Sequence, residues 1–211
     1  MNTYLENLQW RYATKIFDTS KKVSSEDLQE IMEAFRLSAS SLGLQPWKLL
    51  IIENQELKNQ IMEGARNQTH IGNNSHLLVF TKPTTITTNL AERHLNTTST
   101  VTGASREQLA GYESMLYQFI NGLSETEADT WAREQVFLAL GNVLGFLASK
   151  RIDACPVGGF DKQKINEVLQ LKEKGLESVV LLPIGYRNPE DKYATTPKVR
   201  YAVEEVCEII S

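Results

Sequence analysis

Two pairs of basic residues near opposite ends of the chain could bind an anion. Arg11 and Lys15 lie four residues apart, and Lys198 and Arg200 lie two apart directly after Pro197. Arg11 and Lys15 would come together in an extended segment or in a helix, and Lys198 and Arg200 would share a side if extended. The planar fork of Arg suits phosphate oxygens. An isolated pair is more often a solvated surface charge, but four cations together predict a site for a phosphate group.

A turn of small residues could admit a flat ligand. Residues 38–47 read SASSLGLQPW and follow an amphipathic helix pattern. Small side chains let a ligand approach the backbone closely. Ser40 and Ser41 could hydrogen-bond the edge of a polar ring, and Gly43 leaves room for it. The alternative is a simple turn that ends the helix. With the basic residues, this turn indicates a planar, phosphorylated cofactor.

Two other segments could contact such a ring. Asn67, Gln68 and His70 could donate hydrogen bonds, or they could be exposed polar residues of a loop. Residues 156–159 (PVGG) follow an apolar strand pattern and could offer free backbone N–H groups beside two residues without bulk. Their alternative is an ordinary turn between a strand and a helix.

Other kinds of reactive site find no support in the sequence. His70, His76 and His94 are not at metal-ligand spacing, so no metal site is expected. No nucleophile has a partner base, and neither a phosphate-binding loop nor GxGxxG is present. Any catalysis would therefore depend on a bound cofactor that the protein positions and polarises.

Composition predicts a single domain over residues 1–211, because 41% hydrophobic residues are enough for one sizeable core. A net charge of −4, from 22 basic and 26 acidic residues, makes nucleic acid an unexpected partner. The longest apolar run, 179–184, is too short to cross a bilayer, and no leader pattern is seen. Cys155 and Cys207 fit a reducing compartment. We therefore expect a cytoplasmic protein without a membrane partner.

The elements that must position these residues follow from hydrophobic periodicity. Helices are predicted at 25–37, 55–65, 105–122, 125–150 and 161–171. Strands are predicted at 48–53, 77–82, 152–157 and 178–185. The Thr-rich and Asn-rich stretch 85–104 is predicted to be a mobile loop, a lid or the approach to a short helix. Long helices around short strands predict an α+β fold.

The chain resembles the oxygen-insensitive NAD(P)H nitroreductase family of FMN flavoproteins, and within it the branch of nitroreductase B, or dihydropteridine reductase. The resemblance covers nearly the whole chain. It rests on the segments RYATKIFD (11–18), SASSLGLQPW (38–47), NQTH (67–70), SHLLVF (75–80), the helix at 131–145, CPVGGFD (155–161), LKEKGLESVVLLPIGY (171–186) and PKVR (197–200).

This resemblance implies a nitroreductase-like fold, in which helices flank a central, mostly antiparallel sheet and an extended tail is swapped in a homodimer. Two FMN molecules would lie in the dimer interface. The residues that match cofactor-binding positions are Arg11, Ala13, Lys15, Ala39, Ser40, Ser41, Gly43, Asn67, His70, Pro156, Val157, Gly158, Gly159, Lys198 and Arg200. Residues 39–43 match a segment that the partner subunit contributes.

Four positions depart from the family pattern. Ala13 replaces a usual Ser, Ala39 a common Pro, His70 a common Lys and Gly158 a frequent Glu. The change at His70 would weaken one positive contact to the flavin or make it pH-dependent. The change at Gly158 removes a carboxylate, and we expect it to widen the pocket and alter substrate choice.

The implied activity is the reduction of nitroaromatics, quinones or similar electrophiles, with NADH or NADPH as co-substrate. The implied cycle is ping-pong and transfers two electrons, with no catalytic side chain. The positive charge of Lys15, and part of a charge on His70, would support the reduced flavin. The alternatives are a reductase of free flavin, dihydropteridine or an activated alkene, or a flavin-binding or redox-sensing protein without turnover.

Overall fold

The computed structural model describes residues 3–210, and within this range four strands form one antiparallel sheet. The strands are β1 (Lys48–Ile52), β2 (His76–Pro83), β3 (Asp153–Ala154) and β4 (Leu176–Gly185), in the spatial order β1-β2-β4-β3. The expected α+β fold with an antiparallel sheet is confirmed. Residues 1, 2 and 211 of the predicted domain lie outside the described residues.

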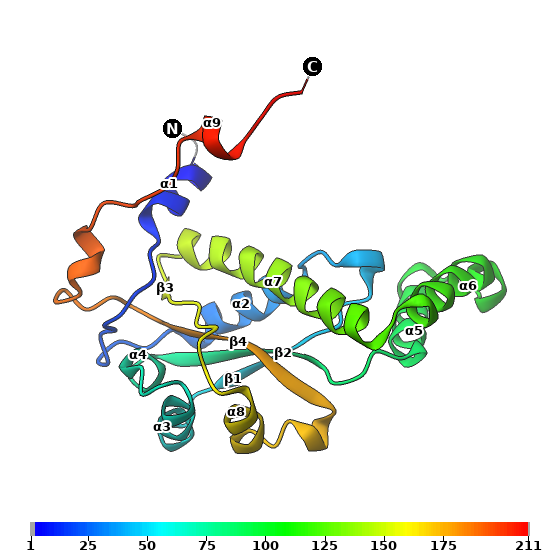
Figure 1. The fold of residues 1–211 in the computed structure, drawn as a ribbon, viewed down its shortest axis with the longest axis horizontal. Helices are drawn as coiled ribbons and strands as arrows, with labels where there is room; N and C mark the ends of the chain where they lie inside the picture. The colour runs from blue at the N-terminus through cyan, green and yellow to red at the C-terminus, as the bar shows by residue number, and fades with distance from the viewer. Residues whose placement is uncertain (1–2, 211) are drawn as a thin grey trace.

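Helices cover both faces of the sheet. Figure 1 shows α2 (Ser25–Arg36) and α7 (Glu125–Ser149) on one side, and α3 (Gln55–Gly64) and α8 (Lys162–Val168) on the other. Successive side chains of a strand point to opposite faces of the sheet, so the continuous apolar run of β2 contributes to both faces. Leu78 and Phe80 pack with the first pair of helices, and Leu77 and Val79 pack with the second. Each face of the sheet is therefore covered by one layer of core side chains.

The starts of α2 and α7 follow their sequence signals. The Ser24 side chain accepts a hydrogen bond from Asp27 N at 3.0 Å. Ser124 and Glu127 form a capping box at the start of α7, which satisfies backbone N–H groups that a helix leaves free. Both helices begin where the sequence predicts them.

The stretch 85–104 is not a loop, and this expectation was wrong. Residues Thr88–Thr102 form α5, which packs against α6 (Arg106–Gly122). Leu90, Ala91 and Leu95 recur at helical spacing and are buried with α6 side chains. Its threonines lower helix propensity, but four of them donate to the carbonyl oxygen four residues earlier, which gives their hydroxyls partners within the helix. Burial against α6 outweighs the propensity.

Other differences are smaller. Of the predicted strand 152–157, only β3 is regular, and Val157 adds an isolated bridge to Leu181. The helix predicted at 161–171 ends at Val168. Short elements escaped prediction because they bury too few residues to show a period: α1 (Thr3–Trp10), η1 (Ser41–Gly43), α4 (Thr69–Gly72), η2 (Lys172–Lys174), η3 (Lys192–Thr195) and α9 (Val203–Val206).

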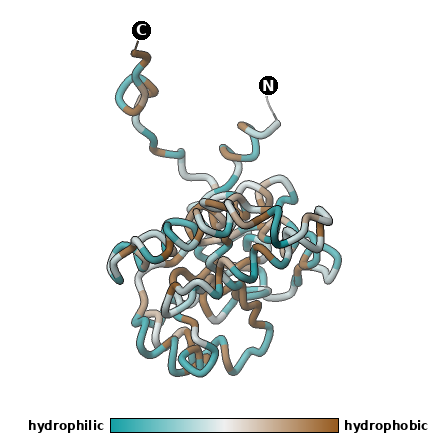
Figure 2. Tube along the Cα trace, turned by 90° about the vertical axis from the view of Figure 1, so that its right-hand side faces the viewer, coloured by the Kyte–Doolittle hydropathy of each residue, from teal (hydrophilic) through white to brown (hydrophobic). Residues whose placement is uncertain are grey.

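The two ends of the chain leave the body of the molecule on the same side (Figure 2). The tail after β4 carries exposed apolar side chains, among them Val199, Tyr201, Ile209 and Ile210. Within residues 3–210, no helix is both long and apolar enough to span a membrane.

Candidate cofactor site

The basic residues from the two ends of the chain meet. Lys198 Nζ donates a hydrogen bond to the carbonyl oxygen of Arg11. Arg11, Lys15, Lys198 and Arg200 all line one surface cavity of about 430 Å³, between the segment after α1 and the tail after η3. The structure thus brings together four cations that lie up to 189 positions apart in the sequence.

Three of the basic groups that line this cavity repel one another. Burial, and then the charge of Arg200, lower the pKa of Arg11. Burial, followed by the charges of Arg11 and Arg200, also lowers the pKa of Lys198. Among residues 3–210, no carboxylate lies within 4.0 Å of these three basic groups. Cations that repel one another in a concave site favour an anionic ligand.

The segment that carries Arg11 and Lys15 is extended, which decides between the two geometries left open by the sequence. Ala13 forms a parallel bridge with Ala154, so this segment runs beside the sheet. Asp191, only 2% exposed, accepts hydrogen bonds from Lys15 N at 2.7 Å and from Ile16 N at 3.1 Å. Burial alone would raise the pKa of Asp191, but these backbone bonds hold it below its ordinary value. Nothing in the sequence singled out Asp191.

Lys15 points toward Cys155 and His70. Its Nζ donates to Cys155 Sγ at 3.2 Å, and His70 Nε2 lies 3.7 Å from the same sulfur. Burial, and then the charge of Lys15, lower the pKa of His70 to about 4. The imidazole is therefore neutral at neutral pH, and the expected part of a positive charge on His70 is absent. Of the two side chains that contact the sulfur, Lys15 therefore carries the positive charge and His70 does not.

The strand end at 156–159 faces open space. A Cβ atom built on Gly158 or Gly159 would meet nothing within 4 Å. The expectation of free backbone N–H groups was wrong for Val157, whose N–H donates to Leu181 O at 2.8 Å. Only the region of the two glycines is left open to a ligand.

Residues 67–70 adjoin this strand end. Gln68 Nε2 donates to Gly159 O at 3.2 Å. Asn67, the residue before Gln68, is exposed and has a φ of 53°. The structure thus places the Asn67 and His70 segment beside the Pro156 to Gly159 segment. The hydrogen bond from Gln68 to Gly159 thus joins the two segments that the sequence predicted to contact a ring.

The turn at 39–43 lies in another part of the fold, against α7. Ser41 N donates to Gln135 Oε1 on α7 at 2.8 Å, and Tyr4 of α1 lies where a Cβ atom built on Gly145 of the same helix would come within 3.1 Å of its hydroxyl. Ten residues of helix separate these two points, a rise of about 15 Å. Gly43 has a φ of 67° and a built Cβ only 2.8 Å from His94 Cε1, so glycine is required there. Within one chain, none of Ala39, Ser40, Ser41 and Gly43 lines the basic cavity.

The described residues contain no group of three or more His, Cys, Asp or Glu side chains that could hold a metal ion.

Comparisons with known proteins place the chain in a family. Residues 8–186 match the model of the Nitroreductase family. The major NAD(P)H-flavin oxidoreductase of Aliivibrio fischeri is 36% identical over 98% of both chains. The oxygen-insensitive NAD(P)H nitroreductase of Salmonella typhimurium is 31% identical over 92% of this chain and 93% of its own. A crystal structure described as a nitroreductase in complex with FMN, from Exiguobacterium sibiricum, shares the fold with a TM-score of 0.86 at 21% identity, over 98% and 97% of the two chains. The family match and the two full-length relatives establish that the chain belongs to the nitroreductase family.

Proposed function

We propose that this protein is an FMN-dependent NAD(P)H oxidoreductase that reduces small electrophiles such as nitroaromatics and quinones. Membership in the nitroreductase family supports this activity, as do relatives that are named for NAD(P)H and flavin. When bound, FMN would accept two electrons from NAD(P)H and pass them to the acceptor.

The observation that carries the proposal is the set of cations without acidic partners. Arg11, Lys198 and Arg200 surround a cavity from which carboxylates are absent among the described residues. A phosphate group would supply the missing negative charge, and Arg and Lys would bind its oxygens through charge-assisted hydrogen bonds. The residues present therefore fit the phosphate end of FMN.

The neighbouring residues fit a flat ring. Gly158 and Gly159 leave open space at a strand end, where a ring could lie against the backbone. Asn67 would offer an amide to the ring edge. Lys15 would hold a positive charge beside the ring and favour negative charge on it. No side chain of this set is assigned a covalent role.

We infer that the complete site needs a homodimer. The turn at 39–43 contacts α7 well away from the basic cavity of its own chain, and the tail exposes apolar side chains. A second copy could cover that tail and bring its own turn to the cofactor. Two free thiols also support placement in the reducing cytoplasm.

The test is an anaerobic absorption spectrum of the full chain mixed with FMN, recorded before and after NADH or NADPH. We expect the flavin band to bleach and to return when a nitroaromatic is added. A bound flavin that does not bleach would favour a flavin-binding protein instead. No bound flavin would contradict the proposal.

A second candidate activity is the reduction of free flavin, because the Aliivibrio relative is named a flavin oxidoreductase. It would use the same cofactor and the same nicotinamide. Steady-state comparison of free FMN, riboflavin, a quinone and a nitroaromatic separates the two, since kcat/KM identifies the preferred acceptor.

A further inference from the structure

The Cys155 thiol connects two side chains that reach it from different parts of the chain. Lys15 comes from the extended segment after α1, and His70 comes from α4. Cys155 itself is 1% exposed, and its backbone N–H donates to Pro183 O at 3.2 Å. This bond to β4 fixes the backbone of Cys155, and its sulfur contacts both side chains.

The protonation states give these contacts a direction. Burial raises the pKa of the Cys155 thiol, and burial with Lys15 lowers that of His70 to about 4, so the thiol is protonated and the imidazole neutral at neutral pH. An ammonium only donates hydrogen bonds, whereas a thiol can accept one and donate another. Lys15 donates to the sulfur, and the S–H can then be directed to His70 Nε2, or to Pro156 O at 4.0 Å. Within residues 3–210, Cys155 is the hydrogen-bond partner of Lys15 Nζ.

We propose that Cys155 is a positioning residue of the cofactor site, which holds the Lys15 ammonium in the orientation that it needs toward the flavin. This inference rests on the FMN binding proposed above. A free lysine side chain populates many rotamers and loses that freedom when it binds a ligand. A partner that orders Lys15 beforehand reduces this loss, which strengthens binding. Because His70 is neutral, its imidazole does not supply a charge that would compensate for a misplaced Lys15.

The experiment compares Cys155→Ala, Cys155→Val and Cys155→Ser with the wild-type chain. FMN affinity of the apoprotein is measured by fluorescence titration, and the midpoint potential of bound FMN by anaerobic redox titration. Both Ala and Val remove the hydrogen-bond acceptor. Ala has a smaller side chain than Cys, whereas Val has a branched one. We expect both to weaken FMN binding about three- to tenfold and to make the potential more negative, where tenfold between the two redox states is about 30 mV.

Cys155→Ser retains an acceptor and is expected to stay within about twofold of wild type. Cys207→Ser is the matched control, because Cys207 is the exposed cysteine among the described residues. Lys15→Met adds a second test: if Cys155 acts through Lys15, Cys155→Ala has no further effect on affinity or potential once Lys15 is replaced. Thermal melts establish that each variant is folded.

Wild-type affinity and potential in both Cys155→Ala and Cys155→Val would overturn the inference while leaving the proposed function intact. The same holds if Cys155→Ser is as weak as Cys155→Ala, or if Cys155→Ala loses affinity equally with and without Lys15. A wild-type chain that binds no FMN would overturn the proposed function, and this inference with it.

Discussion

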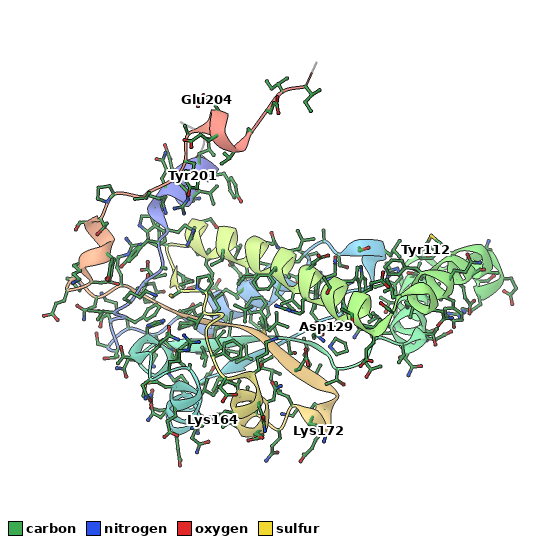
Figure 3. The ribbon with its side chains drawn as sticks, in the orientation of Figure 1. Tyr112, Asp129, Lys164, Lys172, Tyr201 and Glu204 are labelled. Atoms are coloured by element: carbon green, nitrogen blue, oxygen red, sulfur yellow. The ribbon has the colours of Figure 1, made fainter. Side chains whose placement is uncertain are left out.

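Basic side chains in two regions of this molecule differ in whether they have acidic partners. Lys82, on β2 and only 2% exposed, has its Nζ 2.7 Å from Asp129 Oδ1 and 2.8 Å from Glu177 Oε1. Arg11, Lys198 and Arg200 have no such acid among the described residues. Figure 3 shows Asp129 on α7, well away from Tyr201 and Glu204 of the tail.

The difference separates a structural cation from one that serves a ligand. Asp129 and Glu177 balance the charge of Lys82 within the fold, because an unpaired buried ammonium would be strongly destabilising. At the basic cavity the described residues leave the mutual repulsion of the cations in place, and a bound anion would relieve it. A lysine or arginine is therefore a better indicator of a binding site when its acidic partner is missing than when it is merely buried.

Removing the unpaired cations should have the largest effect. Lys198→Ala with Arg200→Ala should weaken FMN binding about a hundredfold or more, because each charge-assisted bond contributes about 1.5–3 kcal/mol and every 1.4 kcal/mol is tenfold. Equilibrium titration of the apoprotein with FMN measures it. Lys164→Ala with Lys172→Ala removes the same charge away from the cavity (Figure 3), from a partly exposed lysine paired with Glu63 and from an exposed one, and should change affinity less than about twofold.

Removing the acids of the paired region should affect the fold and not the cofactor. Asp129→Asn with Glu177→Gln leaves Lys82 buried without a counter-charge, and we expect the free energy of unfolding to fall by about 2 kcal/mol, less than for a fully buried pair because both acids are partly exposed. Urea unfolding measures this loss. FMN affinity should remain within about twofold, and a large loss of affinity would contradict the separation of the two regions.

The two regions should lose stability over different pH ranges when the protein is acidified. The folded-state pKa of His70, about 4, lies below the ordinary 6.5, so between these values the unfolded chain binds a proton that the folded chain does not. Stability is therefore lost as pH falls from 6.5 toward 4. The hydrogen bond from Lys82 lowers the pKa of Asp129 below 3.8, so that contribution is lost only at lower pH.

We expect wild type to lose about 1–2 kcal/mol more than His70→Gln between pH 7 and pH 4.5, allowing for partial solvent access. Urea unfolding at each pH measures the difference. Parallel stability curves for the two proteins would show that His70 does not titrate as described.

The smallest expected effect is on acceptor choice. A side chain at Gly158 enters open space, so Gly158→Glu should leave stability within about 0.5 kcal/mol of wild type. The new carboxylate would narrow the acceptor side of the site and change the ratio of kcat/KM for bulky and small acceptors about three- to tenfold. Gly111→Ala, on α6 and in open space, is the control. Gly103→Ala is unsuitable because the φ of Gly103 is 76°, where an alanine would be strained. An unchanged acceptor profile in Gly158→Glu would remove Gly158 from the determinants of specificity.

The fold was predictable where burial is periodic and strong. Helices α2 and α7 and strands β2 and β4 carry regular apolar patterns, and each appears within two residues of its predicted bounds. Helix α5 was missed because its threonines and asparagines favour loops, while the packing on α6 that stabilises it involves residues farther along the chain. Local propensity does not contain that information.

The candidate site was predictable in part. The residue types at Arg11, Lys15, Lys198 and Arg200 indicated a phosphate, and the family resemblance is confirmed by the family match over residues 8–186. Asp191 and Cys155 were not recognised as parts of the site. Asp191 binds the backbone N–H of Lys15, and Cys155 binds its ammonium group. Both contacts join residues more than 130 positions apart in the sequence, which no local pattern records.

The sequence by itself determined the family, the antiparallel α+β fold and the residue types that a phosphorylated ring would require. Only the tertiary structure decided which charges remain unpaired, that His70 is neutral, and that the 39–43 turn lies away from the basic cavity of its own chain. The physical reason is that charge state and pairing depend on desolvation and on distances between segments remote in sequence, and both arise only when the chain is folded.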